Sequence, residues 1–279
     1  MTGTTMHSPA AQTSGPMQLT FARILRSEWI KLRSLRSTFW SYAIVIIMSI
    51  GMAALGTLNS GVGPVDSMPA EQQAQMVAQS ATFGVFFGQL VVVVLGVLVI
   101  SGEYSTGMIR STMAAVPRRL PALWAKALVL FAATLVVGLI STVGAIATAM
   151  PLWAGKGIDA SLLDSRVFAP ALAGALYLAL LSVFAIGIGT ILRNSAGGIA
   201  AALGILLLLP TLWMLIPGDW ARDAMPYLLP NAGSNFFNVG MSGMGGDGAL
   251  EPWQSLIVIL VWVAASLAGA ALLLKRRDA

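Results

Sequence analysis

Long apolar runs separated by short polar stretches dominate this chain of 279 residues. Six of the runs reach about 20 residues, which is the length that a helix needs to cross the hydrocarbon core of a bilayer. None of these runs contains Asp, Glu, Lys, Arg or His. The pattern therefore predicts an all-α polytopic membrane protein with six transmembrane helices. The predicted spans are residues 39–58, 81–100, 127–150, 170–192, 196–216 and 254–274.

Two different segments precede the first span. Residues 1–18 are rich in Thr, Ser, Ala, Gly and Pro and show no apolar period, so we predict a disordered tail. Residues 19–36 place apolar side chains on one face of a helical wheel and arginines on the other. This is typical of a basic amphipathic helix in the membrane interface, although a plain basic flank of the first span fits the same residues. The residues assigned to this interfacial helix are Arg23, Arg26, Glu28, Trp29, Lys31 and Arg33.

Glu28 departs from the amphipathic pattern, because it falls in the middle of the apolar face. A helix that lies only against lipid would avoid a carboxylate at that position, since an unpaired charge is costly in an apolar environment. The sequence leaves open whether Glu28 faces protein or pairs with Lys31 or Arg36.

The loop at 101–126, between the second and third predicted spans, is the most distinctive polar stretch of the chain. It concentrates charge in a chain with only 10% charged residues. Residues 107–116 contain no proline and Pro117 then ends them, which predicts a short helix beside the membrane. One face of this helix is apolar, as expected for an element that docks on a cytoplasmic partner; the alternative is a solvated connecting loop. The apolar positions are Met108, Ile109, Thr112, Met113 and Val116.

The distribution of charge along the chain predicts its orientation. Of the 16 Lys and Arg residues, only Lys156, Arg166 and Arg222 fall in segments on the side opposite the N-terminus. Of the 11 acidic residues, only Glu28, Glu103 and Asp278 fall on the N-terminal side. The positive-inside rule then predicts a multi-pass protein of the plasma membrane with both termini in the cytoplasm. The net charge of +5 is thus a signal of topology and not of nucleic-acid binding.

A long loop at 217–253 separates the fifth and sixth spans and is unusually apolar for an exterior segment. We predict that residues 219–237 are largely helical and partly buried, dipping back into the outer leaflet, because irregular backbone is tolerated there only inside protein. An aromatic belt at the membrane surface is the alternative.

Polar and small residues inside the spans predict helix packing. Gln89 is a strongly polar side chain well inside the second span, and we expect it to hydrogen-bond a neighbouring helix. Gly84 and Gly88 lie four residues apart, which favours close contact between helices.

The chain lacks the motifs of several catalytic classes. It has no phosphate-binding GxxxxGK[ST] motif, no HExxH motif, no cysteine and a single histidine, His7. Ion-coupled carriers place ionisable groups inside the membrane, and the predicted spans contain none. We therefore expect no catalytic residue and no metal site in this chain, which disfavours a membrane-embedded enzyme. The energy for any transport is expected to come from a cytoplasmic partner.

Four stretches carry a resemblance to a known family. They are SEWIKLRSLRSTFW at 27–40, SGEYSTGMIRSTMAAVPRR at 101–119 followed by Lys126, LRNSAGG at 192–198 and LLPNAG at 228–233. Together they resemble the permease subunits of ABC type 2 transporters in their actinobacterial six-span form, over residues 19–277. The remainder of the chain after the tail, 19–279, is accordingly interpreted as one permease domain.

The resemblance implies a function and a set of site residues. The permease would export a substrate as a homodimer or heterodimer, driven by separate P-loop ATPase subunits that bind ATP and Mg²⁺, so the permease itself would need no cofactor. A non-transporting membrane anchor or signalling subunit that recruits a cytoplasmic protein is the alternative. The outer re-entrant segment would include Pro230, Asn231 and Gly233. The residues implied in coupling to the ATPase are Glu103, Gly107, Met108, Ile109, Arg110, Met113, Pro117 and Arg193.

Overall fold

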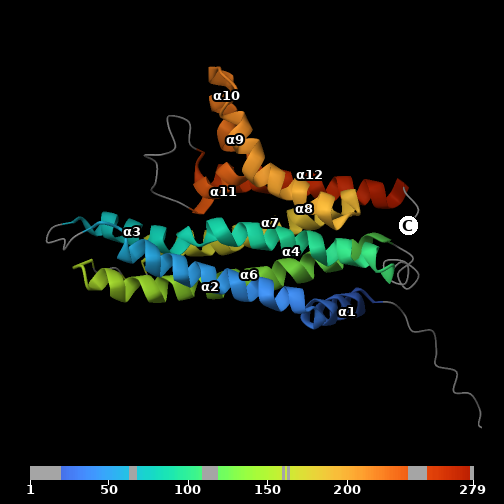
Figure 1. Ribbon diagram of the computed structural model, residues 1–279, viewed down its shortest axis with the longest axis horizontal. Coiled ribbons are helices and arrows are strands. Elements are labelled where there is room, and N and C mark those ends of the chain that lie inside the picture. The colour runs from blue at the N-terminus through green and yellow to red at the C-terminus, as the bar shows by residue number, and fades with distance from the viewer. Residues whose placement is uncertain are drawn as a thin grey trace, which may run out of the picture.

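The computed structural model describes residues 20–62, 68–108, 119–158, 161, 164–237 and 250–276. Within these ranges the chain is almost entirely helical and contains no strand. Six helical segments are long and apolar enough to cross a membrane, and most of them run side by side along the long axis of the molecule (Figure 1). The predicted all-α architecture with six candidate spans is confirmed.

Some predicted features lie outside the described residues. The tail at 1–18 is one of them, and most of the helix expected at 107–116 is another. Of that helix the structure describes only Gly107 and Met108. The roles of Ile109, Arg110, Met113 and Pro117 stay predictions.

The spans follow the predicted order with some shifts at their ends. The first is α2 (Arg36–Leu58), and the second is formed by α3 (Ala70–Phe83) and α4 (Val85–Ser105). The third and fourth are α6 (Arg119–Ala154) and α7 (Ser165–Leu192). The fifth combines α8 (Ser195–Leu203), the π-helical turn η1 (Gly204–Leu208) and α9 (Leu209–Trp213), and the sixth is α12 (Pro252–Arg276).

The second span begins well before the predicted residue 81, because α3 continues it beyond the apolar run. α3 is rich in alanine and glutamine, which are good helix formers, although its polar side chains end the hydropathy signal. Its buried face, including Val77 and Ala81, packs in one cluster with Ile146 and Trp153 of α6. Both helices therefore extend past the predicted spans and support each other there.

α7 is the most deeply buried of the six spans and contacts α4, α6 and α12. Small residues let these helices approach closely: a Cβ at Gly96 of α4 would lie 2.6 Å from the carbonyl oxygen of Ser182 on α7. Gly84 acts similarly, since a Cβ there would lie 2.3 Å from the Cα of Ser49 on α2. The small-residue seam predicted from the sequence thus packs helices within this chain.

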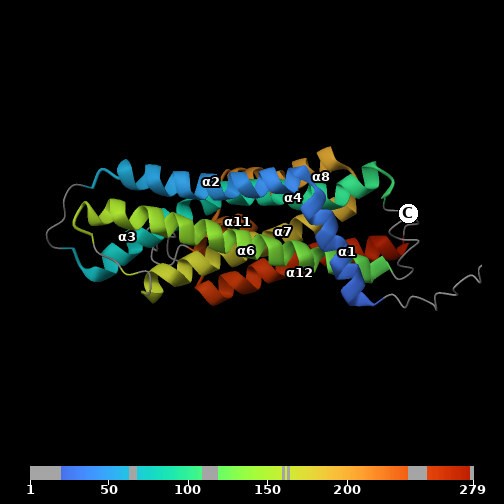
Figure 2. The ribbon, with the colours of Figure 1, turned by 90° about the horizontal axis from the view of Figure 1, so that it is seen from below.

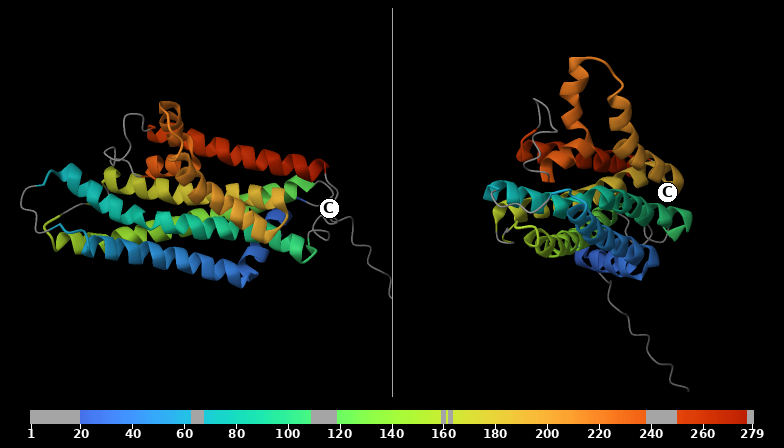
Figure 3. Two further views of the ribbon diagram at one scale, coloured as in Figure 1. Left: turned by 45° about the horizontal axis from the view of Figure 1, so that its top comes forward. Right: turned by 60° about the vertical axis from the view of Figure 1, so that its left-hand side comes forward.

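The fifth span bends away from the bundle. Pro210 has no N–H, and its ring conflicts with the carbonyl group four residues earlier, so a regular α-helix cannot pass through it. The π-helical turn η1 accommodates the disruption just before this proline. Figures 1 and 3 show α9 and the following α10 (Asp219–Ala224) standing away from the remaining helices.

The chain returns to the bundle after this excursion. The short helix η2 (Met225–Tyr227) leads into α11 (Leu229–Phe237), which packs on α7 and α12. Leu229, Ala232 and Phe237 are buried. The prediction that residues 219–237 are largely helical and partly buried is confirmed.

Candidate functional site: a charged end that joins three helices

α1 (Phe21–Ser34) lies crosswise to the spans, near the end of the bundle where α4 finishes and α6 begins (Figure 2). Ile24, Glu28 and Leu32 recur at four-residue spacing, so they share one face of the helix, and all three are buried. This face contacts α6 and α2. The sequence left open whether Glu28 faces protein or pairs with a neighbouring basic residue, and the structure shows that it faces protein and also pairs with Lys31.

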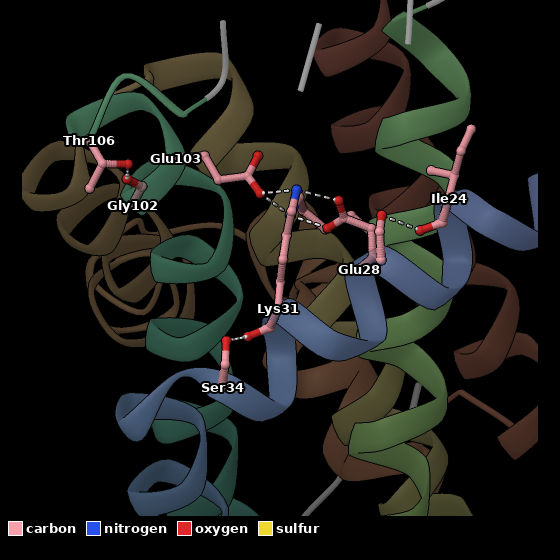
Figure 4. Close-up of polar contacts among 9 residues, drawn as sticks. Ile24, Glu28, Lys31, Ser34, Gly102, Glu103 and Thr106 are labelled. Atoms are coloured by element: carbon pink, nitrogen blue, oxygen red, sulfur yellow. Dashed lines mark hydrogen bonds and ion pairs between the residues drawn. The ribbon is translucent and has the colours of Figure 1, made fainter. Parts of the chain in front are cut away.

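Four charged side chains meet at this end of the bundle. Lys126 of α6 places its Nζ 2.5 Å from Glu28 Oε2 and 2.8 Å from Glu103 Oε1. Lys31 of α1 places its Nζ 2.7 Å from Glu28 Oε1 and 3.1 Å from Glu103 Oε1 (Figure 4). Glu103 belongs to the last turn of α4, so the four residues join α1, α4 and α6. We call these four residues the ion network, and the end of the bundle that holds them the charged end.

The ion network is buried, which makes its pairing essential. The exposed fractions of Glu28, Glu103 and Lys126 are 3%, 4% and 5%. Charges taken out of water destabilise a protein strongly unless a partner compensates them. Two carboxylates and two ammonium groups compensate each other here, and the hydrogen bonds cross between helices that are far apart in the sequence.

The pairing also shifts the proton affinity of the groups on α1. Burial by itself opposes ionisation of Glu28, but the charges and hydrogen bonds of Lys126 and Lys31 together outweigh it and hold the pKa of Glu28 below its ordinary value. Burial likewise disfavours the charged form of Lys31, but its hydrogen bond to Glu28 and the charge of Glu103 raise the pKa of Lys31. Both groups are therefore held in their charged forms at neutral pH.

The turn between α7 and α8 reaches the same end of α4. Arg193 ends α7 in the left-handed region, with φ of 53°, and its guanidinium group lies 5.4 Å from the centre of the Tyr104 ring. Asn194 begins α8, since its side chain accepts a hydrogen bond from the backbone of Gly197. The Ser195 hydroxyl then donates a hydrogen bond of 2.8 Å to that of Ser101. Two predicted coupling residues thus meet at the end of α4: Glu103 belongs to that helix, and Arg193 contacts the next residue, Tyr104.

The predicted coupling segment leaves from this anchored end. α4 stops at Ser105, where Thr106 caps it through backbone and side-chain bonds to the carbonyl of Gly102. Gly107 follows with φ of +71°, a conformation that favours glycine and turns the chain away from the helix. Met108 is exposed. Gly107 and Met108, the first residues of the predicted coupling helix, therefore follow Glu103 of the ion network by four and five residues.

The predicted outer re-entrant residues lie elsewhere, in α11. The Asn231 side chain donates a hydrogen bond of 2.9 Å to the carbonyl of Met225. Gly233 lies against Tyr177 of α7, since a Cβ there would lie 2.4 Å from the tyrosine ring. The Tyr177 hydroxyl donates a hydrogen bond of 2.8 Å to Gln89 Oε1, which confirms that Gln89 bonds a neighbouring helix. Gly233 thus packs α11 on α7, Asn231 bonds the segment just before α11, and none of the three predicted residues belongs to the ion network.

Some contacts of the charged end carry no distinct signal in the sequence. Ser101, Tyr104 and Ser195 are ordinary polar residues near span ends. The position of Lys126 carries more information, because it directly precedes an apolar run and Glu103 follows the preceding apolar run after only two residues. Single opposite charges at the facing ends of consecutive spans favour an ion pair. This signal in the sequence could have predicted the contact between Glu103 and Lys126. Among the residues that the structure describes, no three His, Cys, Asp or Glu side chains are grouped as metal ligands.

Comparison with known families identifies the chain. The family described as ABC-2 family transporter protein matches residues 24–214, which is more than half of the chain. The protein belongs to the ABC-2 transporter family. Comparison with curated proteins gives no match. The matched range of this ABC-2 protein runs from within α1 to just past α9, so it includes all four residues of the ion network. The protein is a membrane permease subunit of an ABC transporter.

Proposed function

We propose that this permease is the membrane half of an exporter driven by a separate cytoplasmic P-loop ATPase, which docks on the charged end through residues 107–116. The ATPase binds ATP and Mg²⁺, and the permease converts its conformational change into movement of helices. Both termini lie in the cytoplasm in this proposal, as the concentration of Lys and Arg at this end supports.

The observation that carries the proposal is the attachment of α4 at the point where the coupling segment leaves it. Glu103 is held by Lys31 and Lys126 only four residues before Gly107. A force applied to residues 107–116 therefore reaches α4 where it is fixed to α1 and α6. The Ser101–Ser195 bond passes the same movement to the turn between α7 and α8. The charged end distributes a local displacement over four spans.

We further propose that two permeases act together, as a homodimer or a heterodimer. The fifth span is the least buried of the six. Its exposed apolar side chains continue past its end to Met214 and Leu215, and a contiguous exposed apolar surface of this kind requires cover. A second permease packed on α8 and α9 satisfies this requirement.

The coupling proposal is tested by a charge on the apolar face of the predicted helix. Met113→Asp is expected to abolish transport and to weaken co-purification with the partner ATPase by two to three decades. The reason is that an uncompensated buried charge costs about 3–5 kcal/mol. Membrane insertion should be unchanged, because residue 113 lies outside the predicted spans.

Ala114→Asp is the matched control, since residue 114 falls on the opposite face of the predicted helix. It adds the same charge to the same segment and should keep the ATPase bound. Full ATPase association by Met113→Asp would show that residues 107–116 are not the coupling element.

A further inference from the structure

The two faces of α1 have different surroundings. The face with Ile24, Glu28 and Leu32 is buried against the bundle. The opposite face carries Arg26 and Arg33, and both are exposed. Because the apolar face of this amphipathic helix is already covered by protein, the surface left for other contacts is the basic one.

The exposed arginines have no acidic partner among the described residues. On this side of the chain the acidic residues are Glu28, Glu103 and Asp278, and the first two already pair with lysines in the ion network. Neither Arg26 nor Arg33 forms an ion pair with a described residue. Their guanidinium groups are available for an anion from outside the chain.

α1 lies next to the start of the first span, at the predicted edge of the membrane. The helix lies crosswise to the spans (Figure 2), and α2 begins at Arg36 directly after it. Two large apolar side chains flank the arginines on the exposed surface: Trp29 is 45% and Ile30 is 57% exposed. A surface that combines arginine with tryptophan and isoleucine, parallel to the membrane plane, matches the boundary between phosphate groups and acyl chains.

We propose that the outward face of α1, formed by Arg26, Trp29, Ile30 and Arg33, binds anionic phospholipid headgroups of the leaflet at the charged end. Guanidinium groups bind phosphate through paired hydrogen bonds, and each basic side chain gains affinity from the negative surface potential. The other face of the same helix holds Glu28 in the ion network. Bound lipid therefore restrains the helix that anchors α4 and α6. The inference goes beyond ATP-driven export and does not depend on it.

The test measures lipid selectivity at α1 directly. The chain contains no cysteine, so Ile30→Cys provides a single site for a bimane fluorophore. The labelled protein is reconstituted into vesicles that contain either brominated phosphatidylglycerol or brominated phosphatidylcholine at equal mole fraction. We expect stronger quenching by phosphatidylglycerol, and the preference should fall as salt is raised.

Two variants in the labelled background give the comparison. Arg26→Gln with Arg33→Gln removes two charges from the proposed surface, and the preference should fall by about fivefold per arginine. Lys275→Gln with Arg276→Gln removes two exposed charges from the last turn of α12 and should leave the preference unchanged. Equal quenching by both lipids in the parent protein, or an equal loss in both double variants, would overturn the proposal.

Discussion

Lys126 is the central residue of the ion network, because its ammonium group contacts both buried carboxylates. Lys31, which shares the same carboxylates, is more exposed to solvent. Removing Lys126 therefore leaves two buried negative charges with a single, partly solvated partner. The effect differs from that of an ordinary surface lysine, whose ion pairs contribute little to stability.

Lys126→Met is expected to destabilise the protein by about 3–5 kcal/mol, because an uncompensated charge stays buried. Thermal unfolding in detergent measures the loss. Lys275→Met removes an exposed charge from α12 and should cost no more than about 1 kcal/mol. If the two variants unfold at the same temperature, the ion network does not stabilise the fold.

The double variant Glu28→Gln with Lys126→Met should lose less stability than the sum of the losses of the two single variants, since the two residues interact directly.

Gly233 is the position at which α11 depends on the absence of a side chain. Gly233→Val should destabilise the protein by about 1–3 kcal/mol, because its Cβ overlaps the Tyr177 ring and the helix must shift. Faster proteolysis within residues 219–237 is the expected companion effect. Gly51→Ala is the control, since a Cβ in that helix meets nothing within 4 Å and should be neutral or stabilising. Unchanged proteolysis of Gly233→Val would show that α11 does not need this contact.

At the scale of the element, α1 is held to the bundle by charge as well as by apolar packing. Its two charged contacts respond to pH in opposite directions. The depressed pKa of Glu28 means that its contribution is present above the ordinary value of 4.5 and is lost as the pH falls through the lower folded value. The raised pKa of Lys31 means that its contribution is present below 10.5 and is lost as the pH rises through the higher folded value.

The docking of α1 should therefore be strongest between pH 4.5 and 10.5. Hydrogen exchange, expressed as protection factors, should show selective loss of protection in α1 when the pH is lowered below this window. The amides of α7 serve as an internal reference, because α7 is deeply buried and carries no residue of the ion network. In Glu28→Gln the acid-dependent loss should disappear. Parallel loss in α1 and α7 would instead indicate general unfolding.

At the scale of the whole molecule, the even number of candidate spans predicts that both ends of the chain lie on one side of the membrane. Cysteines introduced singly at residues 111 and 242, as Ser111→Cys and Ser242→Cys, should be labelled from opposite sides by a reagent that does not cross the bilayer. The reason is that these positions fall in loops separated by three predicted spans. Labelling of both from the outside of intact cells would rule out the six-span arrangement with a cytoplasmic N-terminus.

The sequence by itself determined the number and order of the spans, because six apolar runs without charge have few alternatives to crossing a membrane. It also marked residues 219–237 as largely helical and partly buried, since their apolar side chains require cover. Span ends were less predictable: α3 extends the second span because its alanines pack on α6, and hydropathy does not report that contact.

Only the tertiary structure decided that the Glu28 carboxylate meets the Lys126 ammonium group. Glu28 and Lys126 are far apart in the chain, and helical periodicity describes each helix separately, so no local pattern pairs them. The wheel of α1 likewise separates an apolar face from a basic one without stating which faces protein. Packing against α6 and α2 buries the apolar face of α1 and leaves the arginines outside. The reason is that Glu28, which lies on the apolar face, pairs with Lys126 of α6 only when this face is buried.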